Sequence, residues 1–251
     1  MPRYRLLIEY DGTPYVGWQR QTNGYAVQEA IEKAIRGFTL QDVTLQVAGR
    51  TDTGVHALGQ VAHVDLDRDW DDKRVEIATN AFLHMNEESV AVLSASRVTE
   101  EFHARFSATA RTYEYRIHNR MAPLTVDRKR AWWVKKPLDV DAMLDGSKEL
   151  LGTHDFTTFR AAQCQAKTPV KTLDTIKIAR DGDEIIFTIH ARSFLHNQVR
   201  SIVGTLKMVG EGRWDRARVA AIRDAKDHQL CGALAPPHGL YLAAVDYGEK
   251  T

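Results

Sequence analysis

Alternating apolar and polar positions at the start of the chain predict a strand and then a helix. Residues 4–10 alternate large apolar side chains with Arg5 and Glu9, and the pattern stops at an Asp-Gly pair, which is typical of a strand that ends in a turn. Residues 27–38 instead carry apolar side chains three and four positions apart. This spacing predicts an amphipathic helix with one face on a core.

The same kinds of pattern continue to the end of the chain and give two halves of similar element order. The first half adds expected strands at 43–51, 59–67 and 89–98 and a weaker helix at 73–84. The second half gives a strand at 111–119, a helix at 139–152, a hairpin at 175–191, a helix at 197–210 and a final strand at 239–247. Asp139 is the expected N-cap of its helix, and Gly152 follows the expected end.

These elements predict an α+β protein with two halves of similar plan. We expect the boundary within residues 105–111 and divide the chain into 1–107 and 108–251. Mixed sheets of this kind often bind ligands in a cleft between halves.

Composition indicates a protein of the cytoplasm without a membrane segment. The 251 residues are 43% hydrophobic and 27% charged, the first residues include Arg3 and Arg5, and no run approaches the roughly 20 apolar residues that span a bilayer. Cys164 and Cys231 lie far apart, so we expect neither a disulfide framework nor a zinc site. No metal is expected at His56 or His63, because no acid or cysteine cluster completes a coordination sphere.

Charge is balanced overall but unevenly distributed. The net charge of +1 argues against a protein that coats nucleic acid by bulk charge. Residues 65–72 nevertheless contain five acids, whereas residues 128–136 contain five bases and no acid. The basic run could face phosphates or could simply be solvated, and the counts alone do not distinguish the two.

One short stretch, residues 48–60, suggests chemistry. It places Asp52 among Arg50, small hydroxyl residues and glycines. Glycine lets the backbone bend sharply or pass close to another segment, and threonine can hold a carboxylate. The alternative is an ordinary aspartate in a polar turn.

Two further residues are candidates in the second half. Arg200 lies at the edge of the apolar arc of helix 197–210, where its guanidinium could reach inward toward Asp52, Glu114 or Asp155, or stay on the surface. Tyr113 begins a strand and could be a half-buried aromatic. In the first half, Trp18 could either stack on an unpaired base or cap the core.

Four motifs resemble those of the TruA family of tRNA pseudouridine synthases, in the family's order and over nearly the whole chain. They are "AGRTDTGVHALGQV", "FSATARTYEYRI", "FLHNQVRSIVG" and "APPHGLYLAAVDY". The resemblance implies two ferredoxin-like or RRM-like halves with mostly antiparallel sheets, joined around a central active-site cleft, and a homodimer. It implies isomerisation of uridines 38 to 40 in the tRNA anticodon stem-loop without a cofactor.

The same resemblance implies roles for individual residues. Asp52 would be the catalytic carboxylate, Tyr113 the active-site tyrosine that also contacts substrate, and Arg200 the arginine that pairs with the carboxylate. Arg50 would contact the substrate. One carboxylate suffices because the uracil is retained and no water is added, whereas an ordinary glycosidase needs two.

Two other functions compete with this interpretation. A non-catalytic RNA-binding module of RRM-like plan would show aromatic-rich central strands, which the chain lacks. A nucleoside hydrolase would need a group near Asp52 to activate water. Turnover of uridine-labelled tRNA separates the three by yielding isomerised base, no product or free uracil.

Overall fold

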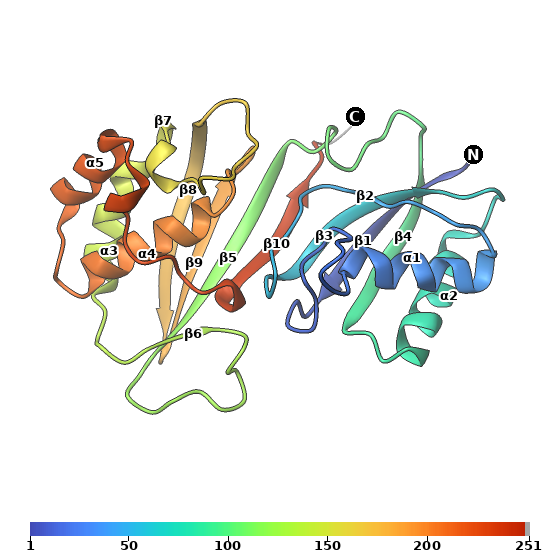
Figure 1. Ribbon diagram of the computed structural model, residues 1–251, viewed down its shortest axis with the longest axis horizontal. Coiled ribbons are helices and arrows are strands. Elements are labelled where there is room, and N and C mark those ends of the chain that lie inside the picture. Colours follow the sequence, from blue (N-terminus) through green and yellow to red (C-terminus); the bar gives the residue numbers. More distant parts are fainter. Residues whose placement is uncertain (249–251) are drawn as a thin grey trace. The chain divides into compact units, whose positions relative to one another are not determined.

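The computed structural model describes residues 1–248 and divides them into two compact units (Figure 1). Unit 1 contains Met1–Thr109 together with the described residues from Tyr241 onward, and unit 2 contains Ala110–Leu240. Each unit combines helices with a mostly antiparallel sheet, so the predicted α+β class is confirmed. No helix within residues 1–248 has the length and hydropathy needed to cross a membrane.

Unit 1 is built on a sheet with the strand order β4-β1-β3-β10. Its elements are β1 (Arg3–Tyr10), α1 (Val27–Thr39), β2 (Gln46–Val47), β3 (His56–Asp65), α2 (Asp72–Met85), β4 (Val90–Val98) and β10 (Leu240–Asp246). Strand β1 pairs antiparallel with both β3 and β4, and β10 runs parallel to β3 at Tyr241 and Leu242.

The alternation in β1 produces the main core of unit 1. Tyr4, Leu6 and Ile8 have no exposed surface, and the apolar arc of α1, including Ile31 and Ile35, is equally buried. Helix α1 therefore packs as its spacing predicted.

A smaller apolar cluster covers the second face of the sheet in unit 1. Ala48 and Val61 pack there with Ala104, which lies between β4 and the end of the unit. The backbone N–H of Ala104 donates to Nδ1 of His63 at 3.1 Å, and Arg3 donates to Asp65 and to the carbonyl oxygen of Phe102. Polar side chains of β1 and β3 thus fix the segment that follows β4.

Unit 2 has the strand order β5-β9-β8-β7. Its strands are β5 (Ala110–Asn119), β6 (Trp132–Val134), β7 (Gly152–Asp155), β8 (Val170–Asp181) and β9 (Glu184–Ala191). Its helices are α3 (Val140–Ser147), α4 (Gln198–Gly210) and α5 (Arg216–Ala225), with short 3-10 turns at Lys148–Leu150, Thr157–Phe159, His228–Leu230 and Pro237–Gly239. The expected hairpin is formed by β8 and β9, and the Asp139 side chain caps α3 by accepting from the N–H of Ala142.

Several predicted boundaries were wrong. The strand expected at 43–51 shrinks to Gln46–Val47, because side chains satisfy the flanking backbone groups: Glu32 accepts from the N–H of Leu45, and Gln60 donates to the carbonyl oxygen of Gly49. The helix expected at 139–152 ends at Ser147 and continues as a 3-10 turn. Strands β6 and β7 and helix α5 were not predicted.

Strand β10 joins a unit that lies more than a hundred residues earlier in the sequence. The sequence pattern places residues 239–247 in the second half, and the structure pairs Tyr241 and Leu242 with His56 and Ala57 of β3. The division into halves 1–107 and 108–251 stays a prediction.

The buried His63 should make stability depend on pH. Burial lowers the pKa of His63, and together with the positive charge of Arg3 and the neighbouring His103 it brings the pKa to about 4. As the pH falls below about 6.5, the unfolded chain binds a proton at this position while the folded chain does not until about pH 4, so folding stability is lost over that interval. The expected loss is about 2–3 kcal/mol.

Urea unfolding at about pH 7 and about pH 4.5 would measure this dependence. In His63→Asn the side-chain oxygen can still accept from Ala104 but does not titrate, so this variant should lose less stability between the two pH values than the wild type. Equal losses of unfolding free energy in the wild type and in His63→Asn would exclude His63 as the source of the pH dependence.

Candidate active site

The turn that carries Asp52 is fixed by backbone contacts with the loop between β1 and α1. Asp52 forms an isolated antiparallel bridge with Gly17, and the N–H of Trp18 donates to the carbonyl oxygen of Thr51 at 3.0 Å. Within the turn, the N–H of Val55 donates to the carbonyl oxygen of Asp52 at 3.1 Å. Asp52 is half-buried, and these hydrogen bonds hold the backbone that carries it.

Glycine at position 17 is required by this contact. Its φ is +109°, and a Cβ atom there would lie 2.6 Å from the carbonyl oxygen of Thr51. Any side chain would push the loop away from the turn.

Two side chains near this turn are structural. Trp18 has no exposed surface and lies 6.0 Å from the ring of Tyr10, so it caps the core and the base-stacking alternative is wrong. His56 is buried, accepts from the N–H of Gly12 at 3.0 Å and stacks on Tyr241 at 4.7 Å. Within residues 1–248, no three His, Cys, Asp or Glu side chains gather as ligands for a metal ion.

In unit 2, Tyr113 lies on β5 opposite Ile189 of β9. The side chain is half-buried, and its ring packs edge-to-face on Phe194 at 5.0 Å. Two positions further along the same face of β5, burial raises the pKa of Tyr115 well above its ordinary value, and the nearby Arg200 cation opposes this rise. Arg200 thus lies near Tyr115, which is on the same face of β5 as Tyr113.

The Arg200 guanidinium is held at two points. Its Nε donates to the carbonyl oxygen of Ala235 at 2.7 Å, and its Nη1 donates to Oδ1 of Asn197 at 3.0 Å. Asn197 precedes α4 in a left-handed conformation with φ +66°, which asparagine tolerates better than most residues. These contacts fix both the position and the plane of the guanidinium.

Gly204 allows the Ala235 support to approach Arg200. A Cβ atom on Gly204 would lie 2.0 Å from the carbonyl oxygen of Ala233, so helix α4 and the 231–235 loop touch backbone to backbone. The N–H of Ala235 also donates to the carbonyl oxygen of Arg200 at 3.3 Å. The glycine one turn after Arg200 therefore determines where the carbonyl group of Ala235 meets the arginine.

The other carboxylates considered as partners of Arg200 have neighbours of their own. Glu114 lies 3.3 Å from Arg116 of the same strand. Asp155 accepts from the backbone and hydroxyl of Thr157 and lies 3.2 Å from Lys226. These contacts do not favour Glu114 or Asp155 as the partner of Arg200.

The candidate residues fall into two sets. Arg50, which is exposed, and Asp52 belong to unit 1, where they share one turn. Tyr113 and Arg200 belong to unit 2, where strand β5 and helix α4 support them.

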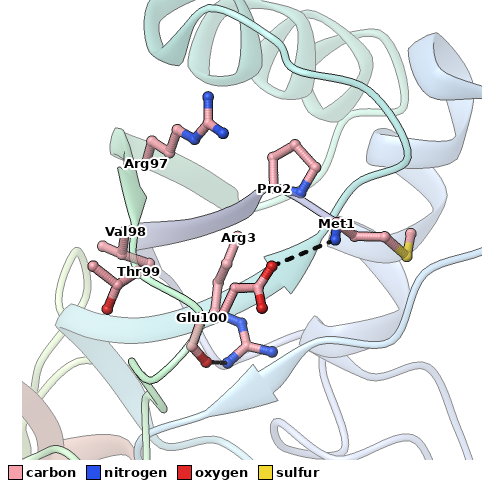
Figure 2. A pocket seen from close by; sticks show the side chains of 7 residues that line it. All are labelled: Met1, Pro2, Arg3, Arg97, Val98, Thr99 and Glu100. Carbon is pink, nitrogen blue, oxygen red and sulfur yellow. Dashed lines mark hydrogen bonds and ion pairs between the residues drawn. The ribbon is translucent and has the colours of Figure 1, made fainter.

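A separate surface hollow of about 590 Å³ lies in unit 1 at the start of β1 (Figure 2). Its lining comprises Met1, Pro2, Arg3, Arg97, Val98, Thr99 and Glu100. Arg3 donates to the carbonyl oxygen of Glu100, and the amino group of Met1 lies 3.8 Å from the Glu100 carboxylate. Since Tyr10, beside the Asp52 turn, is seven residues further along a strand that rises about 3.3 Å per residue, the hollow is remote from Asp52.

Comparison with known proteins identifies the family. The profile of the tRNA pseudouridine synthase family matches residues 6–107 and 147–248. Proteins named tRNA pseudouridine synthase A from Brucella ovis, Brucella suis and Brucella abortus are each 60% identical over 247 residues, which is 98% of this chain and 98% of theirs. The chain belongs to the TruA family of tRNA pseudouridine synthases. It is therefore an isomerase that acts on uridine in tRNA, and the hydrolase and pure binding-module alternatives are set aside.

The sequence analysis missed several residues that support these candidates. Asn197 precedes an evident helix, but its contact with Arg200 depends on a left-handed backbone that the sequence does not reveal. Ala235 contributes only a carbonyl oxygen, which leaves no signal in the sequence. Gln60 did leave a signal in the sequence, because a glutamine between Gly59 and an apolar Val61–Ala62 pair is unusual and this side chain is completely buried.

Replacing Gly204 should disturb unit 2 more than replacing another helical glycine. Gly204→Ala should lower the free energy of unfolding by about 1–3 kcal/mol, because the new methyl group meets the Ala233 carbonyl oxygen at overlapping distance. It should also slow the reaction by moving Ala235 away from Arg200. Urea unfolding and single-turnover assays on tRNA would measure both effects.

Gly146→Ala provides the matched control. Its Cβ would find its nearest neighbour, a methyl carbon of Val219, at 3.5 Å, an ordinary contact, so alanine in helix α3 should be neutral or stabilise the protein by up to about 1 kcal/mol. If both variants behaved alike, the close approach at Gly204 would not constrain the loop.

Proposed function

We propose that this isomerase acts on uridines 38 to 40 of the tRNA anticodon stem-loop and that Asp52 is its catalytic carboxylate. The observation that carries the assignment is the geometry of the Asp52 turn, which holds a half-buried carboxylate on backbone bonded to a neighbouring loop. Fixed placement of a reacting group removes part of the entropic barrier to reaction. Relatives named tRNA pseudouridine synthase A support the substrate class.

The reaction balances without water or cofactor. The C1′–N1 bond of uridine breaks, the uracil turns within the site, and a C1′–C5 bond forms; C5 then loses its proton and N1 gains one. Asp52 acts in its ionised form, by attack at C1′ or on the base or by removal of a ribose proton. A second carboxylic acid of the glycosidase type is not needed, because the departing uracil is also the acceptor.

The other candidates have complementary roles in this proposal. Tyr113 stacks on the extruded uracil or assists deprotonation at C5, for which a half-buried aromatic beside Phe194 is suited. Arg200 pairs with Asp52 and keeps it ionised and oriented, since a planar guanidinium matches a carboxylate at two points. Arg50, exposed on the turn, contacts the RNA.

This function also suggests how the protein assembles and where it acts. A central cleft between the two halves and a homodimer, both implied by the family resemblance, would accommodate a folded tRNA. The basic run 128–136 supports a phosphate-binding face, because its five basic side chains are all exposed. We place the enzyme in the cytoplasm, where its tRNA substrate is found.

Replacing the carboxylate tests the central assignment. Asp52→Asn should leave the fold and most tRNA binding intact but abolish isomerisation, because the amide retains the shape and cannot act as a nucleophile or base. Pseudouridine mapping across tRNA incubated with each protein measures the outcome and the modified positions together. Isomerisation near the wild-type rate would remove Asp52 from the mechanism.

The proposed pair predicts a specific pattern for variants of Arg200. Arg200→Lys should reduce the rate on the order of 100-fold, because an ammonium group keeps the charge but loses the two-point contact. Arg200→Ala should be slower still, and the acid limb of its pH–rate profile should move to higher pH, because loss of a nearby cation disfavours an ionised carboxylate.

A double variant provides the control for this pair. Arg200→Ala combined with Asp52→Asn should be no slower than Asp52→Asn alone, as expected for residues that act as one unit. Normal turnover by Arg200→Ala with an unmoved acid limb would leave the arginine as an RNA contact, and Arg50 would become the next candidate partner.

A further inference from the structure

Three buried polar side chains lie beneath the Asp52 turn and connect it to the sheet of unit 1. Tyr10 of β1 is 4% exposed, Thr51 is 7% exposed and Gln60 of β3 has no exposed surface. The hydroxyl groups of Tyr10 and Thr51 are 2.8 Å apart and share a hydrogen bond. Nε2 of Gln60 donates to the carbonyl oxygen of Gly49 at 2.7 Å and reaches the Tyr10 hydroxyl at 3.4 Å.

These hydrogen bonds hold the turn, whereas the strands are held by their own backbone bonds. A buried hydroxyl or amide costs free energy unless it is hydrogen-bonded, so each group favours the turn position that satisfies it. Gly49 and Thr51 are held from the sheet by Gln60 and Tyr10, and the carbonyl oxygen of Thr51 also accepts from the N–H of Trp18. Asp52 directly follows Thr51, the residue held by both its side chain and its backbone.

We propose that the Tyr10 hydroxyl positions Asp52 for reaction through its hydrogen bond with Thr51. This inference rests on the proposed role of Asp52. Tyr10 acts through Thr51 and is therefore a positioning residue. A displacement of about 1 Å of a reacting group can cost on the order of 100-fold in rate, so a single buried hydroxyl under the turn is enough to matter.

The same strand contains a matched control. Tyr4 lies on the same face of β1 as Tyr10 and is also fully buried. Its hydroxyl donates to the carbonyl oxygen of Trp70 at 2.7 Å, near the start of α2 and at the other end of the strand from the Asp52 turn. Both tyrosines are core residues whose hydroxyl groups are hydrogen-bonded, Tyr4 to Trp70 and Asp69 and Tyr10 to Thr51 and Gln60, but only the Tyr10 hydroxyl contacts the turn.

The experiment compares Tyr10→Phe with Tyr4→Phe in single-turnover and steady-state assays on tRNA, with Tm measured for each protein. Tyr10→Phe should lower kcat by 10- to 100-fold with little change in KM, because ground-state tRNA contacts are preserved and the placement of Asp52 is lost. Tyr4→Phe should show a similar fall in Tm and a kcat within twofold of the wild type.

Variants of Thr51 test whether Tyr10 influences Asp52 through its hydrogen bond with Thr51. Thr51→Val keeps the shape but removes the hydroxyl, and should lower kcat as much as Tyr10→Phe does. The two substitutions combined should be no worse than either alone, since they delete the same hydrogen bond. Thr51→Ser, which retains the hydroxyl, should recover most of the rate lost in Thr51→Val.

Two outcomes would overturn the inference. Wild-type kcat in Tyr10→Phe would show that its hydroxyl does not position the turn, and an equal fall in kcat in Tyr4→Phe would show a general effect of core destabilisation. Asp52→Asn, assayed in parallel, separates this failure from that of the proposed function. An inactive Asp52→Asn with an unaffected Tyr10→Phe rejects the positioning role alone, whereas an active Asp52→Asn rejects the catalytic assignment on which it rests.

Discussion

The structure of the Asp52 turn depends on one close backbone approach. Gly17 sits with φ +109° against the carbonyl oxygen of Thr51, at a distance that leaves no space for a side chain. Because of this contact, the N–H of Trp18 reaches the turn and the Trp18 ring enters the core. The loop after β1 and the turn before β3 therefore form one rigid assembly.

Unit 2 contains a similar close backbone approach beside its own candidate residue, Arg200. At Gly204, helix α4 touches the 231–235 loop backbone to backbone, and the loop then offers the carbonyl oxygen of Ala235 to Arg200. Asn197 supplies the second acceptor from the turn that begins the helix. In both units, a glycine without a side chain lets another backbone segment come into contact next to a charged residue. The backbone therefore holds the charged residue in place, and backbone contacts resist displacement better than contacts between flexible side chains.

Periodicity predicted the elements that bury a regular face, and it failed where side chains replace backbone pairing. Helices α1 and α4 and strands β1 and β9 follow their apolar spacing closely. Helix α5 was missed because only Val219 and Ile222 of its ten residues are buried, too few for a clear period. The pairing of β10 with β3 joins segments almost two hundred residues apart, and no local pattern specifies it.

The candidate site likewise contains some residues that the sequence reveals and others that it does not. The residues proposed to act in the reaction, Asp52, Tyr113 and Arg200, lie in sequence motifs that resemble those of the family, so they could be selected from the sequence. The groups that hold them could not, since Ala235 acts through a carbonyl oxygen and Tyr10 occupies what is otherwise an ordinary core position of a strand. An isomerase that retains the uracil as its leaving group does not need a second carboxylic acid. Its reaction rate depends instead on a carboxylate held in one position. The polar groups buried at the Asp52 turn, two hydroxyls and one amide, meet that requirement because their hydrogen bonds hold the turn in place.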